Sequence, residues 1–408
     1  MDKKKCFSIV LLPAIVSMQL FGGAIPRAYE EYISEYKQKE FAYDYEKNSL
    51  EALKLRDSWI APLEINYAYS RSNPYIGEQI TQSASVRMNQ PIFQSGGIYY
   101  GIKFANAKHL FDDYSTQSRQ RSMIKETMAT LFSIRQYDLK EKKQHLLVAN
   151  AAINVAQKQE EYLSGQLDSG FLDNAIIQKN SVVQTLFDIE TAKAKLIAKF
   201  RSLSDKDYTT TPLPHLSLIT KEEFLQHNIA LQLSHVSKQQ SRYAKNVRIA
   251  AYLPRVSLTA AYNWNKKENQ QFSANIPPNS EENNYYSYGF SISMPIDINT
   301  RRDVESARVD YLKAKVLQQD KLREEQALFE QVMQNIENYK KKIALSEENI
   351  ALYTKLLKDT KELFVAGYKT AYDVDTLKNS VEIQKIDKAI YEIDQQLELL
   401  NLYEIYNK

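Results

Sequence analysis

The chain has 408 residues, which is enough for two or three ordinary domains or for one large repetitive one. Its charged fraction of 25% and hydrophobic fraction of 43% are typical of a folded protein and argue against disorder. The formal net charge of +3 is too small for a protein that binds nucleic acid through a basic surface.

Residues 1–24 have the features of a secretory signal peptide. Three lysines, Lys3 to Lys5, precede an apolar run from Phe7 to Phe21, and Gly22-Gly23-Ala24 provides the small residues of a cleavage site. The run is too short for a spanning helix. Cys6, the one cysteine, precedes the predicted cleavage site, so it is not a lipoprotein cysteine. We expect an exported chain that relies on packing or assembly rather than on disulfides.

Two long stretches of the sequence, 92–211 and 296–408, contain none of the eleven prolines. Both are rich in Ala, Leu, Lys, Glu and Gln, which favour helices. Their apolar residues recur at seven-residue intervals, which predicts long, coiled-coil-like helices. A helix over residues 100–165 would be roughly 100 Å long. Examples of the seven-residue series are Phe132, Leu139, Leu146 and Ile153, and Ile343, Ile350, Leu357 and Phe364.

Between the helical stretches the apolar pattern has a period of two, which predicts strands with one apolar face and one small or polar face. We expect loops at about 71–81 and 265–284, where polar residues and prolines gather. The alternating residues are Leu63, Ile65, Tyr67 and Tyr69; Ala84, Val86 and Met88; Val256, Leu258, Ala260, Tyr262 and Trp264; and Tyr286, Tyr288, Phe290, Ile292 and Met294.

The order helix, hairpin, long helix, helix occurs twice, which indicates an internal duplication. The first repeat is expected over 25–203 with its hairpin at 62–92, and the second over 221–408 with its hairpin at 254–296. A linker over 204–220 would contain "TTTPLPHLS", which breaks the helical pattern.

Alternating strands in an exported chain favour an outer-membrane barrel over a soluble sandwich, because four strands between such long helices leave no second sheet to pack against. Four strands cannot close alone, and open edges in lipid would leave backbone groups unsatisfied. Two chains sharing one barrel would give eight strands, and three would give twelve. The fold class is therefore mixed α and β, with long helical hairpins and four antiparallel strands per chain in a shared barrel.

Prolines mark the joints between sheet and helices, since proline cannot donate to a strand ladder and is accepted near a helix start. We expect Pro91 to end the second strand, with Gly96 and Gly97 easing the turn into the helix. At the other joint, capping oxygens are expected from Asp297, Asn299 and Thr300. The predicted joint residues are Pro62, Pro91, Gly96, Gly97, Pro254 and Pro295.

Over residues 27–404 the sequence resembles the outer-membrane efflux protein family, the TolC-like exit ducts of Gram-negative bacteria. "QPIFQSGG" (90–97) is similar to the family's strand-to-helix signature, "NVRIAAYLPRVSLTAAYNW" (246–264) to its second approach to the barrel, and "ELFVAGYKTAYDVDTLKNS" (362–380) to its second periplasmic turn. The resemblance implies a homotrimer with a twelve-stranded barrel and a periplasmic tunnel. It also implies a periplasmic adaptor (membrane fusion) protein, and an inner-membrane efflux pump or ABC exporter, as partners.

A duct needs a gate, which we expect at the helical turns farthest from the membrane. The resemblance implies that Asp373 lines the entrance as a ring of carboxylates and that Lys369 belongs to the ion-pair network that closes it. Asp375 is near enough to contribute, and Asp168 and Asp173 on the first turn are possible partners of Lys369. The alternative is that these are exposed turn and helix-cap residues, since Asp favours both places. The expected turn glycines are Gly165, Gly170 and Gly367.

The sequence contains no nucleotide-binding, zinc-protease or hydrolase motif, and its five histidines show no zinc-ligand spacing, so we expect no enzyme and no cofactor. Two alternatives remain. One is an exported long-helix scaffold or adhesin without a pore. The other is a stand-alone porin, which is disfavoured because porins have no use for long helices.

Overall fold

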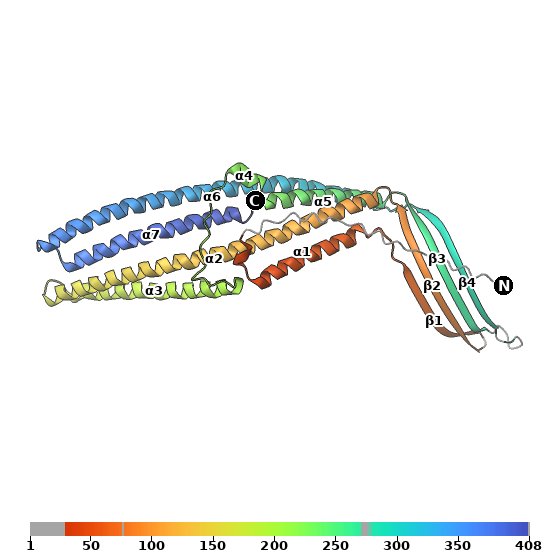
Figure 1. Ribbon diagram of the computed structural model, residues 1–408, viewed down its shortest axis with the longest axis horizontal. Coiled ribbons are helices and arrows are strands. Elements are labelled where there is room, and N and C mark those ends of the chain that lie inside the picture. Colours follow the sequence, from red (N-terminus) through yellow and green to blue (C-terminus); the bar gives the residue numbers. More distant parts are fainter. Residues whose placement is uncertain (1–28, 76, 271–276, 278, 407–408) are drawn as a thin grey trace.

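The computed structural model describes residues 29–406 except Ile76, 271–276 and Pro278. A long body of helices carries a four-stranded sheet at one end, and the sheet is bent away from the axis of the body (Figure 1). No helix in the described residues is long and apolar enough to cross a membrane. The predicted signal peptide and Cys6 lie outside the described residues.

Two helices run along the body, as the seven-residue pattern predicts. They are α2 (Gly97–Leu163) and α6 (Thr300–Val365), and the 67 residues of α2 correspond to a length of about 100 Å. Each turns back at the end opposite the sheet into a shorter partner, so α2 pairs with α3 and α6 with α7 (Figure 1). The remaining helices are η1 (Glu30–Tyr32), α1 (Glu35–Arg56), α3 (Ser169–Leu203), α4 (Lys221–Gln226), α5 (Ile229–Ala251) and α7 (Ala371–Tyr403).

The sheet is antiparallel, in the order β1-β2-β3-β4. The strands are β1 (Glu64–Tyr75), β2 (Gly77–Phe93), β3 (Arg255–Gln270) and β4 (Asn279–Ser293). Paired residues lie on one face, and the register places Ile65 opposite Val86, Val86 opposite Tyr262, and Tyr262 opposite Tyr286. The apolar residues of all four strands therefore share a face, as their period of two predicts.

The expected hairpin loops were too long. Residues 71–75 and 77–81 are strand, and so are 265–270 and 279–284. The ladder extends because polar residues pair across the strands: Lys267 lies opposite Glu281, and the Trp264 indole N–H donates to Glu282 at 2.8 Å. Opposite charges facing one another stabilise a strand pair without any apolar signal.

The first joint also differs from expectation, because β2 does not stop at Pro91. Pro91 lies opposite Ser257, and the register shifts between Pro91 and Phe93, where the strand ends. A proline at such an irregularity does not break the ladder. The prolines nearest the other strand ends, namely Pro62, Pro254 and Pro295, lie just outside them.

The turn into α2 is made by Gly96, the residue before the helix, with a φ of 87°. Its neighbour Ser95 also has a positive φ, of 48°, and the Ser95 hydroxyl donates to the Pro254 carbonyl at 2.6 Å. Gly97 instead allows neighbouring side chains to approach the backbone closely. A Cβ at this position would lie 3.2 Å from the Gln94 side chain and 3.4 Å from that of Ala250. The two glycines thus let α2 begin directly beneath the sheet, against α5.

At the second joint the expected caps are only partly right. Asn299 precedes α6 but makes no side-chain cap, and the Thr300 hydroxyl donates to the Asp297 carbonyl instead. Asp297 alone supplies an acceptor, which receives the Asn299 N–H at 2.9 Å. The hydrogen bonds of this turn therefore run to Asp297, and the side chain of Asn299 does not cap the helix.

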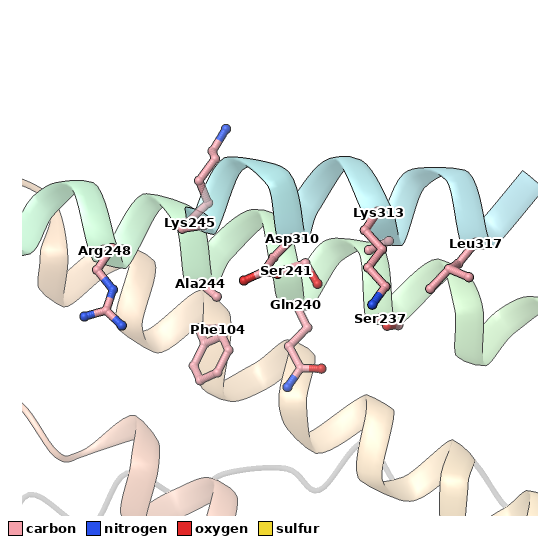
Figure 2. Close-up of a pocket in the computed structure, with 12 residues that line it drawn as sticks. Phe104, Ser237, Gln240, Ser241, Ala244, Lys245, Arg248, Asp310, Lys313 and Leu317 are labelled. Carbon is pink, nitrogen blue, oxygen red and sulfur yellow. The ribbon is translucent and has the colours of Figure 1, made fainter. Parts of the chain in front are cut away.

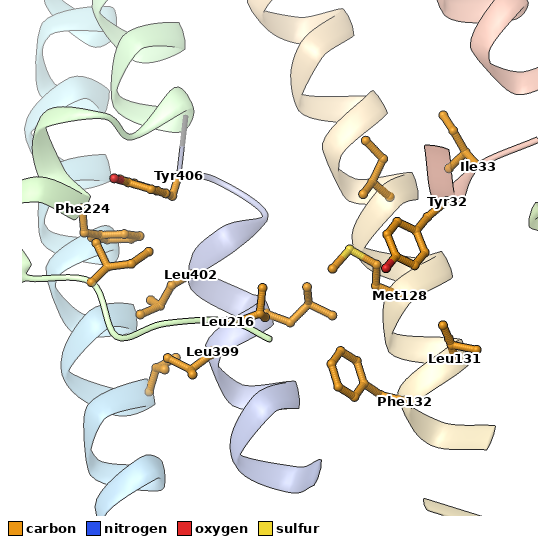
Figure 3. Close-up of a cluster of buried hydrophobic side chains, with 14 of the residues drawn as sticks. Tyr32, Ile33, Met128, Leu131, Phe132, Leu216, Phe224, Leu399, Leu402 and Tyr406 are labelled. Carbon is orange, nitrogen blue, oxygen red and sulfur yellow. The ribbon is translucent and has the colours of Figure 1, made fainter. Parts of the chain in front are cut away.

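A single core holds the middle of the body (Figure 3). Phe132 and Met128 of α2 face Leu399 and Leu402 of α7, and Leu216 of the segment between α3 and α4 lies between them. Residues 403–406 are fixed to this core. Arg121 donates to the Tyr406 carbonyl, and the Tyr406 hydroxyl donates to Glu223 at 2.7 Å.

The glycine at the first joint generates a stability prediction. Gly96→Ala should lower the stability of the protein by about 1 kcal/mol, because an alanine at positive φ is strained. Gly101→Ala is the matched control: this residue is inside α2 with open space around it, so alanine there should stabilise by about 0.5–1 kcal/mol. Thermal unfolding followed by circular dichroism measures both. Equal stability of the two variants would contradict the argument.

Candidate functional site

The two helical turns at the far end of the body have the same design. Gly165 and Gly367 follow α2 and α6 with φ values of 75° and 83°. In each turn the N–H after the glycine donates five residues back, from Gln166 to Glu161 and from Tyr368 to Leu363. This arrangement ends a helix and needs glycine. Gly170, expected as a turn residue, instead lies in the first turn of α3, where its N–H donates to Asp168.

Asp373 is the cap partner of Thr370 at the start of α7. The Thr370 N–H donates to the Asp373 carboxylate at 2.9 Å, and the Asp373 N–H donates back to the Thr370 hydroxyl at 3.2 Å. The bond from the Thr370 N–H lowers the pKa of Asp373. Lys369 lies 4.0 Å from the same carboxylate. Two of the predicted gate residues are therefore brought together, within one turn.

The structure does not bring the other predicted gate residues to Lys369. Asp168 precedes α3 and accepts the Gly170 N–H at 2.7 Å, while Asp173 and Asp375 are exposed. Within the described residues of this single chain, Lys369 pairs with neither Asp168 nor Asp173. The roles of these carboxylates in an assembly remain a prediction.

A row of polar contacts between α2 and α7 joins the two hairpins, and sequence reasoning missed it. Toward the turns, Asn379 donates to Asn150 and the Tyr372 hydroxyl donates to Glu160, each at 2.7 Å. Two further contacts lie nearer the core: Lys143 to Asp387 at 2.6 Å, and Gln136 to Asp394 at 2.5 Å. We call these four contacts the polar seam. Its signal in the sequence is a polar residue every seven positions, as at 136, 143 and 150.

A hollow of about 500 Å³ opens in the polar seam beside the turn between α6 and α7. Asn150, Asn154 and Gln157 line it from α2, and Tyr372 and Asp373 line it from α7. Most of these side chains carry amide, hydroxyl or charged groups, so the hollow suits water rather than an apolar ligand. The two hairpins are thus incompletely packed against each other at this end.

Burial also fades toward the turns. The last buried residue of α2 is Gln144 and that of α6 is Ser346, while burial resumes at Ala175 in α3 and at Val381 in α7. In the described chain, then, apolar side chains near the ends of both hairpins are half-buried or exposed rather than buried. Elements with so few buried apolar contacts open more easily than the core does.

A second hollow, also of about 500 Å³, lies between α5 and α6 near the sheet (Figure 2). Phe104 and Leu317 line it together with Lys245, Arg248 and Lys313. Lys245 lies over the Tyr311 ring, 5.1 Å from its centre, and Arg248 is 3.8 Å from Asp303. Two of its cations therefore have partners already.

One group of side chains approaches the geometry of a metal site. Ligand atoms of Glu141 and His145 on α2 and of Glu190 on α3 lie within 4.8 Å of one another. The Lys193 ammonium, however, donates to Glu141 at 2.7 Å and also contacts Asp138. This ion pair already balances the Glu141 charge, so we assign no metal to the group.

Asp394 in the polar seam generates a pH prediction. Burial raises the pKa of Asp394, against the opposing effect of Lys140. A carboxyl whose pKa is raised by folding adds stability below its unfolded pKa, and this stability is lost as the pH rises through the folded value. Asp394→Asn mimics the protonated acid and keeps an acceptor for Gln136. At pH 7.5 it should raise the thermal midpoint slightly, on the order of 1 °C, and below pH 4 it should have no effect.

The thermal midpoint of the assembled protein in detergent, measured from pH 3.5 to pH 8, checks this. Asp394→Ala is the control, because it leaves the Gln136 amide without its acceptor and should lower the midpoint at every pH. An Asp394→Asn variant that is less stable at pH 7.5 would show that the ionised carboxylate is favourable here.

The sequence model of the family "outer membrane efflux protein" matches residues 221–408. No curated protein sequence matches the chain. Among solved structures, VceC, an outer membrane protein of Vibrio cholerae, is 13% identical with a TM-score of 0.70, and the likeness covers 93% of this chain and 95% of that one. The CmeC outer membrane channel of Campylobacter jejuni is also 13% identical with a TM-score of 0.70, over 93% and 85% of the two chains.

The open state of the MtrE outer membrane channel of Neisseria gonorrhoeae has a TM-score of 0.55 and 13% identity, over 92% of this chain and 86% of that one. At such identities the likeness concerns the fold. The family match covers residues 221–408, which hold β3, β4 and the second helical hairpin, and the fold likeness extends over both hairpins and the sheet. Residues 221–408 thus match the outer membrane efflux protein family, and the chain as a whole has the fold of these outer membrane channels.

Proposed function

We propose that the protein is the outer-membrane exit duct of a tripartite efflux or type I secretion system. The observation that carries the proposal is one chain in which an open sheet with an apolar outer face is joined to two helical hairpins that extend away from it. The apolar face of the sheet can contact lipid. The hairpins can extend into an aqueous compartment that is deep enough for a helix of about 100 Å. Residues 221–408 match the outer membrane efflux protein family, which supports the same function.

Three copies would complete the duct. Four strands per chain give a barrel of twelve, which removes the open edges at β1 and β4. The hairpins of three chains would then surround a tunnel that continues the barrel. Such a duct performs no chemistry and moves cargo passively, so the energy must come from an inner-membrane pump or ABC exporter reached through a periplasmic adaptor.

The two alternatives suit the chain less well. A soluble scaffold or adhesin would bury the apolar face of its sheet, yet Tyr286, Tyr288 and Phe290 are each more than 70% exposed in this chain. A stand-alone porin would be formed by strands, whereas most of this chain is in long helices. The exit duct uses both parts.

The gate is proposed at the turns, with the polar seam as the line along which the hairpins separate. Opening that line exposes groups that water can satisfy, so it costs less than opening an apolar contact. Tyr372 and Glu160 would hold the last contact of the seam. The Lys369 and Asp373 pair would fix the turn beside it, and Asp168, Asp173 and Asp375 would add negative charge at the entrance, which favours cations.

Photocrosslinking tests the function in intact cells. A photoreactive residue at position 369, in place of the lysine in the far turn, should capture a periplasmic adaptor protein that mass spectrometry identifies. The matched control is position 54, where an exposed lysine near the sheet end of α1 lies far from the turns and should not capture it. Capture at neither position, in a protein that is folded and in the outer membrane, would contradict docking through the turns.

The gate generates a separate prediction. Tyr372→Phe removes the hydrogen bond to Glu160, worth about 1 kcal/mol in each chain, and should raise the conductance of the protein in planar bilayers. Tyr368→Phe is the control: this neighbouring tyrosine is 80% exposed and makes no side-chain hydrogen bond among the described residues. An unchanged conductance in Tyr372→Phe would mean that this contact does not hold the duct closed.

A further inference from the structure

The joint between β4 and α6 presents bare apolar side chains. Ile296 and Ile298 are 95% and 92% exposed, more than any other large apolar residue in the described chain. They lie in the short connection that leaves the sheet and enters the helical body, and not at a loop tip. A soluble surface rarely exposes two adjacent large apolar side chains so completely, so a partner of apolar character is expected here.

The two isoleucines continue the apolar column of β4. In that strand Tyr286, Tyr288, Phe290 and Ile292 alternate with small or polar residues, and all four are exposed on the apolar face of the sheet. Met294, Ile296 and Ile298 keep the same alternation beyond the last strand residue, Ser293. Residues 294–299 are not strand, so exposed apolar side chains follow the end of the column in the connection that leads to the helices.

The apolar column of β4 is by itself shorter than the apolar band of an outer-membrane barrel. From Tyr286 to Ile292 the strand covers roughly 20 Å, which at a tilt of about 45° is only about 14 Å of membrane depth. Barrels in the outer membrane present an apolar band about 25 Å tall. Met294, Ile296 and Ile298 add exposed apolar surface at the end of the column that is nearest the helical body.

Positive charge follows immediately. Arg301 and Arg302 are exposed in the first turn of α6, three and four residues after Ile298. Among the described contacts, Arg301 makes no side-chain hydrogen bond or ion pair, and the one bond of Arg302 is to the Asn299 side-chain oxygen at 3.3 Å. The nearby carboxylates are engaged elsewhere: Asp297 accepts the Asn299 N–H, and Asp303 accepts from the Tyr252 hydroxyl.

We propose that residues 294–302, here called the joint lip, are a phospholipid-binding site at the membrane leaflet that faces the helical body. Ile296 and Ile298 lie among the upper acyl chains, and Arg301 and Arg302 bind the headgroup phosphates, with a preference for anionic lipids. The nearness of the exposed isoleucines to the end of β4, and two guanidinium groups that have no carboxylate partner among the described contacts, support this placement. The inference rests on the proposed exit duct, because it needs the sheet to lie in a membrane.

Spin labelling of the assembled protein in vesicles of phosphatidylethanolamine and phosphatidylglycerol tests the site. A nitroxide at Ile298→Cys, in a background where Cys6 is replaced by serine, should collide with oxygen and be protected from a water-soluble nickel complex. Ser306→Cys, on an exposed turn of α6 farther from the sheet, is the aqueous control. A label at Ile298→Cys that the nickel complex reaches would overturn the proposal. A label shielded from both reagents would also overturn it, because a second copy of the chain would then cover the lip.

A label at Ile292→Cys separates this inference from the proposed function. If both labels lie in lipid, the proposal stands. If only the label at Ile292→Cys does, the barrel is right and the joint lip is wrong. If neither does, the membrane placement of the sheet fails as well.

Arg301→Gln with Arg302→Gln tests the headgroup contact. The affinity of the trimer for phosphatidylglycerol, measured by native mass spectrometry, should fall roughly 5-fold for each arginine removed. Arg308→Gln is the control, because Arg308 lies farther along α6 and already has Glu305 at 3.6 Å. Equal losses in the double variant and the control would contradict a specific role for the lip.

Discussion

The open edges of the sheet are the constraint on which the rest of the molecule depends. In the described chain, β1 and β4 each pair on one side only, so one row of backbone N–H and C=O groups on each strand has no strand partner. In lipid such groups cost several kcal/mol each, so the sheet cannot enter a membrane as a single chain. If further copies close the sheet into a barrel, as proposed, their number and pairing determine the position of each helical body. The joints, with Gly96 and Gly97 at one and Asp297 at the other, transmit that placement from the sheet to the hairpins.

The helical body has a buried hydrophobic core in its middle and few buried side chains near the turns. In the middle, aromatic and aliphatic side chains of α2 and α7 enclose Leu216, and residues 403–406 are fixed by Arg121 and Glu223. Toward the turns, buried side chains give way to the polar seam and its hollow. Because burial decreases toward the turns, we expect the turn end of the hairpins to open more easily than the end that joins the sheet. In α2 the apolar seven-residue series runs beside a polar series at 136, 143 and 150, which supplies three of the four contacts of the polar seam.

Local patterns in the sequence predicted the long helices, the strand faces and the glycine turns at Gly165 and Gly367. The predicted hairpin loops were too long because polar cross-strand pairs, such as Lys267 and Glu281, extend the strands. A run of polar residues without an apolar alternation is typical of a loop, so the sequence pattern alone did not indicate these strands. Asn299 resembled a helix cap, but the turn closed through Asp297 instead. Tyr372 and Glu160 were missed because 212 positions separate them, and their meeting depends on how two hairpins pack. Asp373 was found through the resemblance, whereas its capping role follows from Thr370 lying three positions before it.

The attachment of residues 403–406 has a consequence for the order of events in export. The core beneath α2 contains Leu399, Leu400 and Leu402, and the Ile229 N–H at the start of α5 donates to the Ile405 carbonyl at 2.8 Å. A chain that crosses a membrane from its N-terminus delivers these residues late. Until they arrive, Phe132, Phe224 and Leu216 lack the surface that covers them. The core of the helical body is therefore completed only when the residues near 399–406 are in place, which makes its folding one of the last steps of delivery.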